Sequence, residues 1–497
     1  MFYDANDIQL STVVDDVTGE DTAKKYQSWD WHVITIDGND HDAIRTAIQA
    51  GIDEVSKPTL IIGKTVMGKG VKDDSGAGYE GQVELHGKPL GKSNASFDKT
   101  IEGLGGNPAM PFVIFDDVQA HYATILKAKT AAAVKQKEAF NKWSNTHEEQ
   151  SQQLATFLSG ELPYIDWDSI DQKTTDATRN ASSRVLAHLA DHVHNLIVSS
   201  ADLSNSDKTD GFLKKTTSFK RGDFSGAFLQ AGVSELTMAA LCTGMALHGG
   251  VIPVCATFFA FSDYMKPAMR VAALMEQRVI FLWTHDAFRV GEDGPTHQPI
   301  EQEAQLRLLE KLKNHSGHNA LLALRPADGP ETTQSWKLAL TNQCSPSGMI
   351  LSRQNIVEAD TTNRQSDAHK TNMGAYIVYQ SDPNPEVILV ANGSEVSTIY
   401  EAAKMLQSDY KVRVVSAPSE GLFRNTDASY QNDVLPAQTP KFGLTAGLPV
   451  TLQGLVGANG KVWGLDHFGY SAPYTVLDEK FGFTAENVVK EVKQMMG

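Results

Sequence analysis

Two histidines twelve residues apart, His285 and His297, lie in the segment of this chain best suited to acid–base chemistry. The apolar residues 279–284 before them have the composition of a buried strand, and the intervening residues are rich in glycine and proline. Three carboxylates lie between the histidines: Asp286, Glu292 and Asp293. Loops that leave buried strands often carry the reactive groups of α/β enzymes, and histidine titrates near neutral pH. The segment therefore predicts a proton-transfer site, although an isolated His–Asp pair more often belongs to a polar surface loop.

A second candidate is Glu235, which enters an apolar stretch with the composition of a helix. A glutamate in the first turn of a helix usually lies at the surface, where it complements the helix dipole. Further along, residues 257–264 contain four aromatic side chains. Such a cluster can be ordinary core, or it can form a pocket for a planar ring. From the residues alone, both alternatives remain open.

The elements that must position these residues alternate between strands and helices. The expected strands are 31–36, 59–63, 196–200, 251–257, 279–284, 386–391 and 412–416. The expected helices are 42–55, a long polar stretch within 115–160, 235–247 and 269–275, and a polar linker is expected at 358–372. This alternation predicts an α/β fold with parallel sheets covered on both faces. We expect three domains, at 1–145, 146–365 and 366–497.

Composition narrows the class of protein. The 497 residues are 41% hydrophobic and 21% charged, which is ordinary for a globular protein, and the net charge is −16. An acidic chain is a poor candidate for binding nucleic acid or an anionic membrane, so an anionic substrate requires a local basic cluster. The three cysteines (242, 255 and 344) are too few and too scattered for a disulfide framework or zinc site. Without a signal pattern or a membrane-length apolar run, the sequence predicts a cytoplasmic protein.

The stretch Gly291-Glu-Asp-Gly-Pro-Thr-His-Gln-Pro299 resembles transketolase, a thiamine-diphosphate enzyme, and the resemblance extends from Phe2 to the C-terminus. It implies three parallel or mixed-sheet α/β domains of the transketolase type: diphosphate-binding, pyrimidine-binding and C-terminal. It also implies a homodimer that acts on sugar phosphates in the pentose phosphate pathway. The implied reaction transfers a two-carbon ketol unit from a ketose phosphate to an aldose or aldose phosphate.

The resemblance also implies which residues bind the cofactor. Glu235 would donate a hydrogen bond to the aminopyrimidine ring, where the protein orients and tunes the cofactor. Phe258, Phe261 and Tyr264 would form the pocket around that ring. His86, on a glycine-rich loop, would contact the cofactor diphosphate and substrate oxygens.

Substrate binding is assigned in the same way. Four residues would hold the substrate phosphate: Arg179, Ser200, His285 and Arg353. Guanidinium groups suit this role because their planar fork matches phosphate oxygens, although a single arginine is more often a salt-bridged surface residue. Asp293 would accept a hydrogen bond from the C2 hydroxyl of the donor sugar. His297 would assist proton transfer near the reacting carbon.

The metal site departs from the family pattern. Phe2-Tyr-Asp-Ala-Asn-Asp-Ile8 resembles the end of the metal motif, which implies the Asn6 side chain and the Ile8 carbonyl as ligands of Mg²⁺ or Ca²⁺. The Gly-Asp-Gly that begins the motif and supplies an aspartate ligand does not precede it. We therefore expect a truncated first domain with an exposed sheet edge or face. A separate N-terminal subunit, a different dimer, or a weak or inactive protein would each account for this.

Other functions remain as alternatives. Within the same cofactor class, the chain could be a deoxyxylulose-phosphate synthase or a keto-acid dehydrogenase subunit, but residues 293–299 and the paired Arg179 and Arg353 argue against both. A non-catalytic subunit is favoured by the missing aspartate ligand. It is opposed by the presence of Glu235, His285 and the other assigned site residues.

Overall fold

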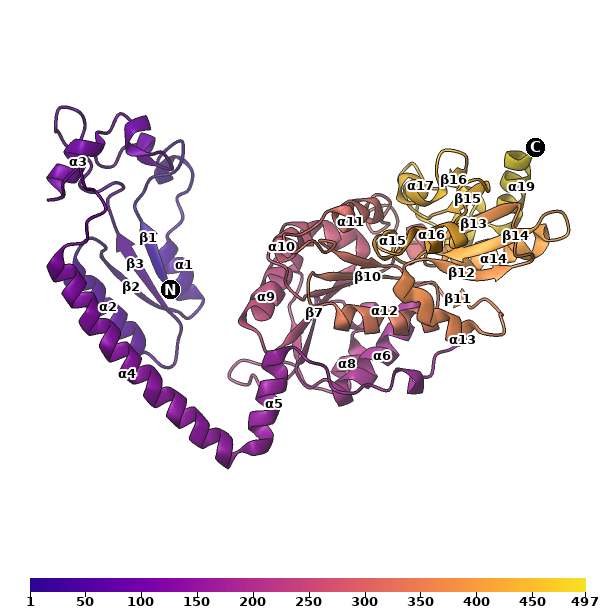
Figure 1. Cartoon of the computed structure of the whole chain (residues 1–497), viewed down its shortest axis with the longest axis horizontal. Helices are drawn as coiled ribbons and strands as arrows, with labels where there is room; N and C mark the ends of the chain where they lie inside the picture. The colour runs from indigo at the N-terminus through magenta and orange to yellow at the C-terminus, as the bar shows by residue number, and fades with distance from the viewer. The chain divides into compact units, whose positions relative to one another are not determined.

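The computed structural model describes residues 1–497, which form two compact units, Met1–Phe140 and Asn141–Gly497. The first unit contains a parallel sheet with strand order β1-β3-β2 (Figure 1). Its strands are β1 (Phe2–Ala5), β2 (His32–Asp37) and β3 (Thr59–Lys64). The predicted β-α-β unit is confirmed, with helix α2 (His41–Asp53) between β2 and β3.

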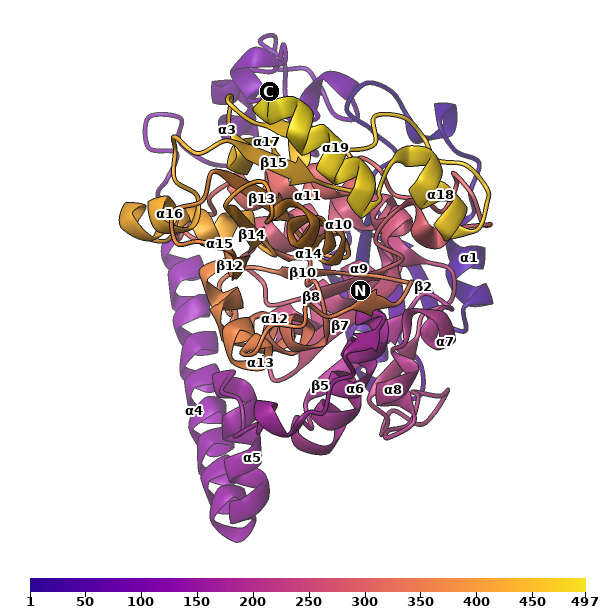
Figure 2. The same ribbon diagram turned by 90° about the vertical axis from the view of Figure 1, so that its right-hand side faces the viewer.

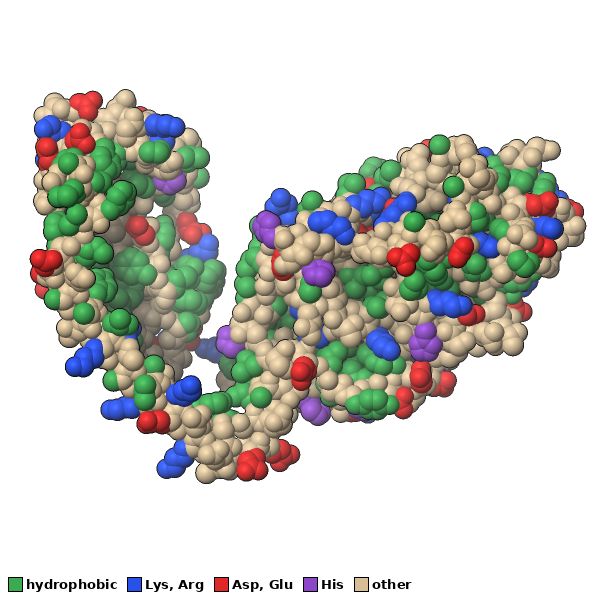
Figure 3. Space-filling model, in the orientation of Figure 1, with side chains coloured by type: hydrophobic (Ala, Val, Ile, Leu, Met, Phe, Trp, Pro, Cys, Tyr) green, Lys and Arg blue, Asp and Glu red, His purple; other side chains and the backbone are tan.

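Much apolar surface of the first unit is exposed. On α2, the Ile48 and Ile52 side chains whose spacing predicts the helix are both exposed, and Val55, just beyond it, is 94% exposed. Figure 3 shows hydrophobic side chains spread over this unit. Helix α2 still packs against β2 and β3 through the buried Ala47, and α1 (Thr22–Ser28) adds Tyr26 and Ala23 to the small core of the sheet. The exposed Ile48, Ile52 and Val55 side chains therefore belong to α2 and the region just after it, and the exposed sheet edge or face stays a prediction.

The rest of the first unit has little regular structure. Residues 65–115 contain two short 3₁₀ helices, η2 (Val83–Leu85) and η3 (Leu90–Lys92), and the helix α3 (Phe97–Gly103). A small second core of Val71, Leu85 and Ala95 holds this region together. The long helical stretch predicted at 115–160 is two helices, α4 (Asp116–Thr146) and α5 (Glu148–Ser159). The break falls at His147, whose backbone leaves the helical region with φ −135° and ψ 58°.

The second unit begins with a six-stranded parallel sheet of order β6-β5-β7-β8-β10-β9. Its strands are β5 (Leu196–Ser200), β6 (Phe228–Gln230), β7 (Ile252–Phe258), β8 (Ile280–Thr284), β9 (Leu322–Leu324) and β10 (Ser347–Leu351). We call residues 175–357, which contain this sheet, the central domain. Strands β7, β8 and β10 are buried along their whole length, as continuous apolar runs in a doubly covered parallel sheet should be.

Helices cover both faces of the central sheet. One core lies against α6 (Thr178–His192) and α12 (Gly329–Thr341), and the other against α9 (Glu235–His248), α10 (Ser262–Leu274) and α11 (Gln302–Lys311). The strands and the helix at 235–247 predicted for this domain are confirmed to within about one residue, whereas the helix predicted at 269–275 begins earlier, at Ser262. A short antiparallel ladder joins β4 (Thr175–Asp176) to β11 (Ile356–Val357), so the segments that carry Arg179 and Arg353 lie side by side.

The C-terminal domain, residues 376–497, contains a mixed sheet of order β12-β14-β13-β15-β16. Its strands are β12 (Tyr376–Gln380), β13 (Val387–Ala391), β14 (Val412–Ser416), β15 (Lys441–Leu444) and β16 (Lys461–Trp463); only β12 runs antiparallel to its neighbour. Helices α14 (Glu395–Leu406) and α19 (Ala485–Met496) pack together on one face (Figure 2). Four short helices complete the domain: α15 (Glu420–Arg424), α16 (Ala428–Val434), α17 (Val450–Val456) and α18 (Tyr474–Phe481). No helix of the chain combines the length and apolar character needed to span a membrane.

The segment predicted as a polar linker, residues 358–372, is folded against the central domain. It contains α13 (Arg364–Asp367) and a 3₁₀ helix, η7 (Ala368–Met373). The Arg364 guanidinium is buried and pairs with Asp328 at 2.5 Å and Glu331 at 3.0 Å. A polar sequence alone could not show whether this segment is an exposed linker or is held by buried ion pairs. The two carboxylates that pair with Arg364 lie at the start of α12, more than 30 residues earlier in the chain.

Glu358 in this segment should make stability depend on pH. Burial, and then repulsion from Asp328, raise the pKa of Glu358 to about 7. Between its ordinary pKa and pH 7 the unfolded chain ionises first, so stability should fall as pH rises through this window and level off above it. Glu358→Gln should therefore raise the free energy of unfolding at pH 8 by about 1 kcal/mol after allowance for solvent screening, with little effect at pH 4.5. Urea unfolding at both pH values tests this, with exposed Glu486→Gln as control; an equal change at both would contradict it.

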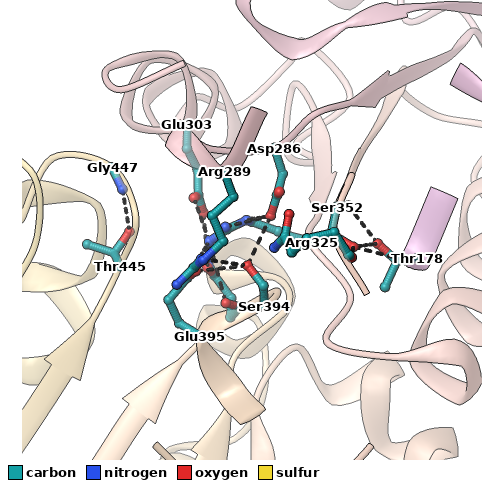
Figure 4. A network of polar contacts seen from close by, with 12 residues as sticks. Thr178, Asp286, Arg289, Glu303, Arg325, Ser352, Ser394, Glu395, Thr445 and Gly447 are labelled. Atoms are coloured by element: carbon teal, nitrogen blue, oxygen red, sulfur yellow. Dashed lines mark hydrogen bonds and ion pairs between the residues drawn. The ribbon is translucent and has the colours of Figure 1, made fainter. Parts of the chain in front are cut away.

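A buried ion network joins the central and C-terminal domains. Figure 4 shows Arg325 between Asp286 of the central domain and Glu395 of the C-terminal domain. Its guanidinium nitrogens lie 2.7 Å from Asp286 Oδ2 and 2.6 Å from Glu395 Oε2, and Arg289 reaches Glu395 Oε1 at 2.5 Å. All four side chains are at least 95% buried. The network fixes Asp286, which directly follows His285.

Loss of Arg325 should destabilise the second unit strongly. Arg325→Met removes the charge that compensates Asp286 and Glu395, and breaking a buried pair from one side costs about 3–5 kcal/mol. Urea unfolding followed by tryptophan fluorescence would measure the change. Arg424→Met, at a half-exposed arginine of the C-terminal domain, is the matched control and should cost less than about 1 kcal/mol. Equal losses in the two variants would contradict the assigned role.

Candidate active site

The predicted site residues of the second unit gather at the carboxyl edge of the central sheet. Strands β5, β7, β8 and β10 run parallel and end at Ser200, Phe258, Thr284 and Leu351. His285 directly follows β8, and Arg353 lies two residues beyond β10. Glu235 begins α9, after the connection from β6. This edge is where open α/β sheets bind their ligands.

Two arginines and a histidine make a cationic cluster at this edge. Arg179, in the first turn of α6, donates from Nη1 to the Ser206 carbonyl at 2.8 Å and to His285 Nε2 at 3.3 Å. Burial, and then repulsion from Arg353, lower the pKa of Arg179. Neither arginine forms an ion pair with a carboxylate. Asp207 and Asp176 attract Arg179 without forming an ion pair with it. Two guanidinium groups that repel each other and lack a direct carboxylate partner form a site suited to an anion.

His285 is neutral and held in a strained backbone conformation. Burial, followed by the charges of Arg179 and Arg353, lowers its pKa to about 2. Because Arg179 donates to Nε2, the ring proton lies on Nδ1, which contacts Thr284 Oγ1 at 2.8 Å. The residue has a φ of 64°, in the left-handed region that non-glycine residues avoid. Such strain persists where the neighbouring structure fixes the residue on both sides, here β8 and the Asp286 network.

Ser200, the last residue of β5, is fully buried. Its hydroxyl donates to Asp207 Oδ2 at 2.6 Å, and Thr209 donates to Asp207 Oδ1 from its backbone and side chain. Burial raises the pKa of Asp207. The structure thus places the Ser200 hydroxyl against the buried carboxyl of Asp207. Asp207 directly follows Ser206, whose carbonyl accepts the hydrogen bond from Arg179. Its predicted contact with substrate phosphate stays a prediction.

Glu235 and the aromatic residues form the adjoining part of the site. Glu235 is buried, and its Oε1 accepts a hydrogen bond from Thr257 Oγ1 at 3.3 Å. The Phe258 ring lies 3.7 Å from the His285 ring and 6.0 Å from the nearly parallel ring of Phe261. Tyr264 continues the row, at 6.1 Å from Phe261, and is largely exposed.

The loop Gly291–Gln298 carries the remaining predicted groups. His297 is half-buried, with its ring 5.3 Å from that of Phe261 and its Nδ1 2.8 Å from Thr296 Oγ1. Asp293 is exposed and forms no ion pair. The charge of His297 contributes to the lowered pKa of His285, so the two histidines of the sequence pattern face one site.

Three predicted residues belong to the first unit. Asn6 directly follows β1, and its Oδ1 accepts a hydrogen bond from the Ile8 amide at 3.0 Å. His86 follows η2, is half-buried, and its Nδ1 is enclosed without a hydrogen-bond partner. No group of three or more His, Cys, Asp or Glu side chains is arranged to hold a metal ion.

Several participating residues were missed from the sequence. Thr257, which contacts Glu235, stands in the aromatic segment, and Gln298 stands in the histidine segment, so both had a local signal. Asp207 had no signal in the local sequence, because its role depends on the contact with Ser200 that the fold creates. The same holds for Arg325 and Glu395, which are 70 residues apart in sequence.

Family models match all three regions of the chain. The transketolase thiamine diphosphate-binding domain matches residues 1–163, the transketolase pyrimidine-binding domain matches 175–358, and the transketolase-like C-terminal domain matches 374–484. The match over 1–163 gives no support to the expectations that the first domain is truncated or that a separate N-terminal subunit is required.

The similar proteins and solved structures are also transketolases. The whole chain is 35% identical to a transketolase of Staphylococcus epidermidis and 36% identical to that of Bacillus subtilis, and it covers 73% of each. A transketolase structure from Leishmania mexicana matches 99% of the chain and 70% of its own with a TM-score of 0.90 and 31% identity. A Pichia stipitis transketolase solved with sedoheptulose 7-phosphate matches 99% of the chain and 71% of its own, with a TM-score of 0.88 and 29% identity. These findings confirm the expected fold and enzymatic function, and the chain belongs to the transketolase family of thiamine-diphosphate-dependent enzymes.

Proposed function

We propose that the chain transfers a two-carbon ketol unit from a ketose phosphate to an aldose or aldose phosphate, at the carboxyl edge of the central sheet. The observation that carries this proposal is the pair of arginines that form no ion pair, Arg179 and Arg353, beside a neutral His285. The row of rings from Phe258 to His297 adjoins them. A phosphate site next to a stacking surface suits a sugar phosphate that reacts on a planar cofactor.

The residues fit the pyrimidine end of thiamine diphosphate. Phe258 and Phe261 present nearly parallel rings for stacking, and Tyr264 extends them. The buried Glu235 makes only a 3.3 Å contact with Thr257, so its carboxyl can hydrogen-bond a ring nitrogen. When bound, the cofactor supplies the carbon centre that attacks the donor ketone. Glu235 would then hold the proton that sets the tautomer of the aminopyrimidine.

The other residues of the site would each bind a different part of the substrate. Four residues would bind its phosphate: Arg179, Arg353, His285 and Ser200. His285 would also orient Arg179 by accepting a hydrogen bond from it. Asp293 would accept a hydrogen bond from the donor C2 hydroxyl. His297 would move protons at the substrate oxygen, as histidine side chains do in general acid–base catalysis.

The first unit would hold the diphosphate and its metal. The turn Asn6–Ile8 offers a side-chain oxygen and a backbone carbonyl, and oxygen ligands suit Mg²⁺ or Ca²⁺. His86, with an unpartnered Nδ1, would contact the diphosphate and substrate oxygens. Calorimetric titration of thiamine diphosphate with and without Mg²⁺, on the wild type and Asn6→Ala, would measure this coupling.

We also propose that the chain is a homodimer in the cytoplasm and belongs to the pentose phosphate pathway. Helices α9 and α10 expose a row of large apolar side chains: Leu236, Leu241, Leu247, Val271 and Leu274. Surfaces of this kind usually mark a protein interface. Light scattering coupled to size-exclusion chromatography would give the mass of the particle.

A direct assay tests the proposed function. The purified chain should transfer the ketol unit from xylulose 5-phosphate to ribose 5-phosphate when thiamine diphosphate and Mg²⁺ are added. Turnover that disappears in Glu235→Ala would support the proposal. Absence of turnover by a folded wild-type chain that binds the cofactor would contradict it and favour a weak or inactive transketolase-like subunit.

A further inference from the structure

The loop Gly291–Gln298 carries Asp293 and His297 but has few backbone hydrogen bonds of its own. Two are present, from the Gly294 amide to the Gly291 carbonyl at 3.1 Å and from the His297 amide to the Gly294 carbonyl at 3.0 Å. A loop of this kind must be held by contacts from outside, because catalytic groups need positions fixed to within about 0.5 Å.

A short segment of the C-terminal domain, Gly469–Ser471, supplies these contacts. The Gln298 side-chain amide, 4% exposed, donates to the Gly291 carbonyl at 3.1 Å and to the Tyr470 carbonyl at 3.0 Å. One amide group therefore joins the two ends of the loop and attaches both to Tyr470. Near the start of the loop, the Ser471 hydroxyl donates to the Glu292 carbonyl at 2.5 Å.

Gly469 makes the close approach possible. A Cβ at this position would lie 1.8 Å from Gln298 Oε1, well inside van der Waals contact. The backbone of Gly469 is not left-handed, so the glycine is required by the contact and not by its conformation. Gln298 Oε1 has no hydrogen-bond partner, so its orientation follows from the two carbonyls that its Nε2 faces.

We propose that Gln298, Gly469 and Ser471 are positioning residues for ketol transfer, through which the C-terminal domain sets the position of Asp293 and His297. The inference rests on the proposed function of these two groups. It assigns the C-terminal domain a part in catalysis although none of its residues belongs to the predicted site.

The test combines hydrogen–deuterium exchange of the loop with kinetics of the cofactor-loaded full chain. In Gln298→Ala and Ser471→Ala, exchange at the Gly294 and His297 amides should accelerate about tenfold or more, because their local opening becomes easier. The kcat should fall about tenfold or more, because small displacements of positioned groups are costly, while thiamine diphosphate affinity stays within about twofold.

Ser419→Ala is the matched control. Ser419 is another serine of the C-terminal domain that reaches the central domain, where it donates to Glu310 Oε1 at 2.6 Å away from the loop. It should leave both loop exchange and kcat within about twofold of wild type. A similar loss of kcat in Ser419→Ala would overturn the proposal, because general loosening of the domain contact would then suffice.

A double-mutant cycle isolates the role of Gly469. Gly469→Ala should lower kcat in the wild-type background and have no further effect in Gln298→Ala, where the amide it displaces is absent. Additive losses would overturn its action through Gln298.

Unchanged exchange and kcat in all single variants would overturn the whole proposal. Exchange needs no turnover, so an inactive wild type would contradict the proposed function while the loop result is still measured.

Discussion

Replacement of Glu235 by glutamine is expected to lower the kcat of ketol transfer by about 10²- to 10³-fold, within the range that positioned acid–base groups contribute. Glutamine fills the same volume and can keep the contact with Thr257, so the fold should be unaffected. It cannot exchange a proton with the aminopyrimidine ring as a carboxyl group can. The loss should therefore appear in kcat, with a smaller change in cofactor affinity, as measured by steady-state assays and by titration of thiamine diphosphate.

A matched variant separates this effect from helix electrostatics. Glu148 is the first residue of α5, as Glu235 is of α9, but it is exposed and lies outside the site. Glu148→Gln should leave kcat within about twofold, since a first-turn carboxylate contributes only about 0.3–1 kcal/mol through the helix dipole. A Glu235→Gln variant with wild-type kcat would show that Glu235 does not assist the cofactor, and the pyrimidine-site assignment would fail with it.

The inner strands of the sheets follow closely from the sequence. Strands such as β8 and β13 are almost wholly apolar, and their burial in a parallel sheet leaves little freedom in where they begin and end. Short strands such as β6, β9 and β16 are not among the expected strands. The long helical stretch after the first domain is less well specified, because polar residues fit either one helix or two. Nothing in its composition signals the break at His147.

The site, like the fold, could be predicted from the sequence only in part. His285 could be assigned from the sequence pattern, because it directly follows a predicted strand. Arg179 and Arg353 were assigned through the resemblance to transketolase, since neither α6 nor β10 is among the expected elements. The mutual geometry of the three residues could not be assigned, since it depends on the strand order. Two contacts that fix the site join residues far apart in the chain: Asp286 with Arg325, and Gln298 with Tyr470. Long-range pairing of this kind has no signature in one sequence.

Removal of the arginines should give the second large effect, and one specific for phosphate. Arg179→Ala and Arg353→Ala are each expected to raise KM for xylulose 5-phosphate or ribose 5-phosphate about 10- to 100-fold, equivalent to the about 1.5–3 kcal/mol of a charge-assisted hydrogen bond. The kcat/KM for an unphosphorylated acceptor such as glycolaldehyde should change less than about threefold, because no phosphate contact is lost.

The contrast between the two acceptors is the decisive measurement. Removing Arg179 relieves its repulsion with Arg353 but also removes its attraction to Asp207 and Asp176 and its hydrogen bond to the Ser206 carbonyl, so we expect a small net change in stability. Arg184→Ala on the same helix is the control: this arginine already pairs with Asp176 at 2.6 Å, so its loss should affect stability and leave the ratio of the two kcat/KM values unchanged. Equal losses with phosphorylated and unphosphorylated acceptors in Arg179→Ala would mean that this guanidinium supports the shape of the site and not the phosphate. The unpaired charge at the edge of the central sheet would then need another ligand to explain it.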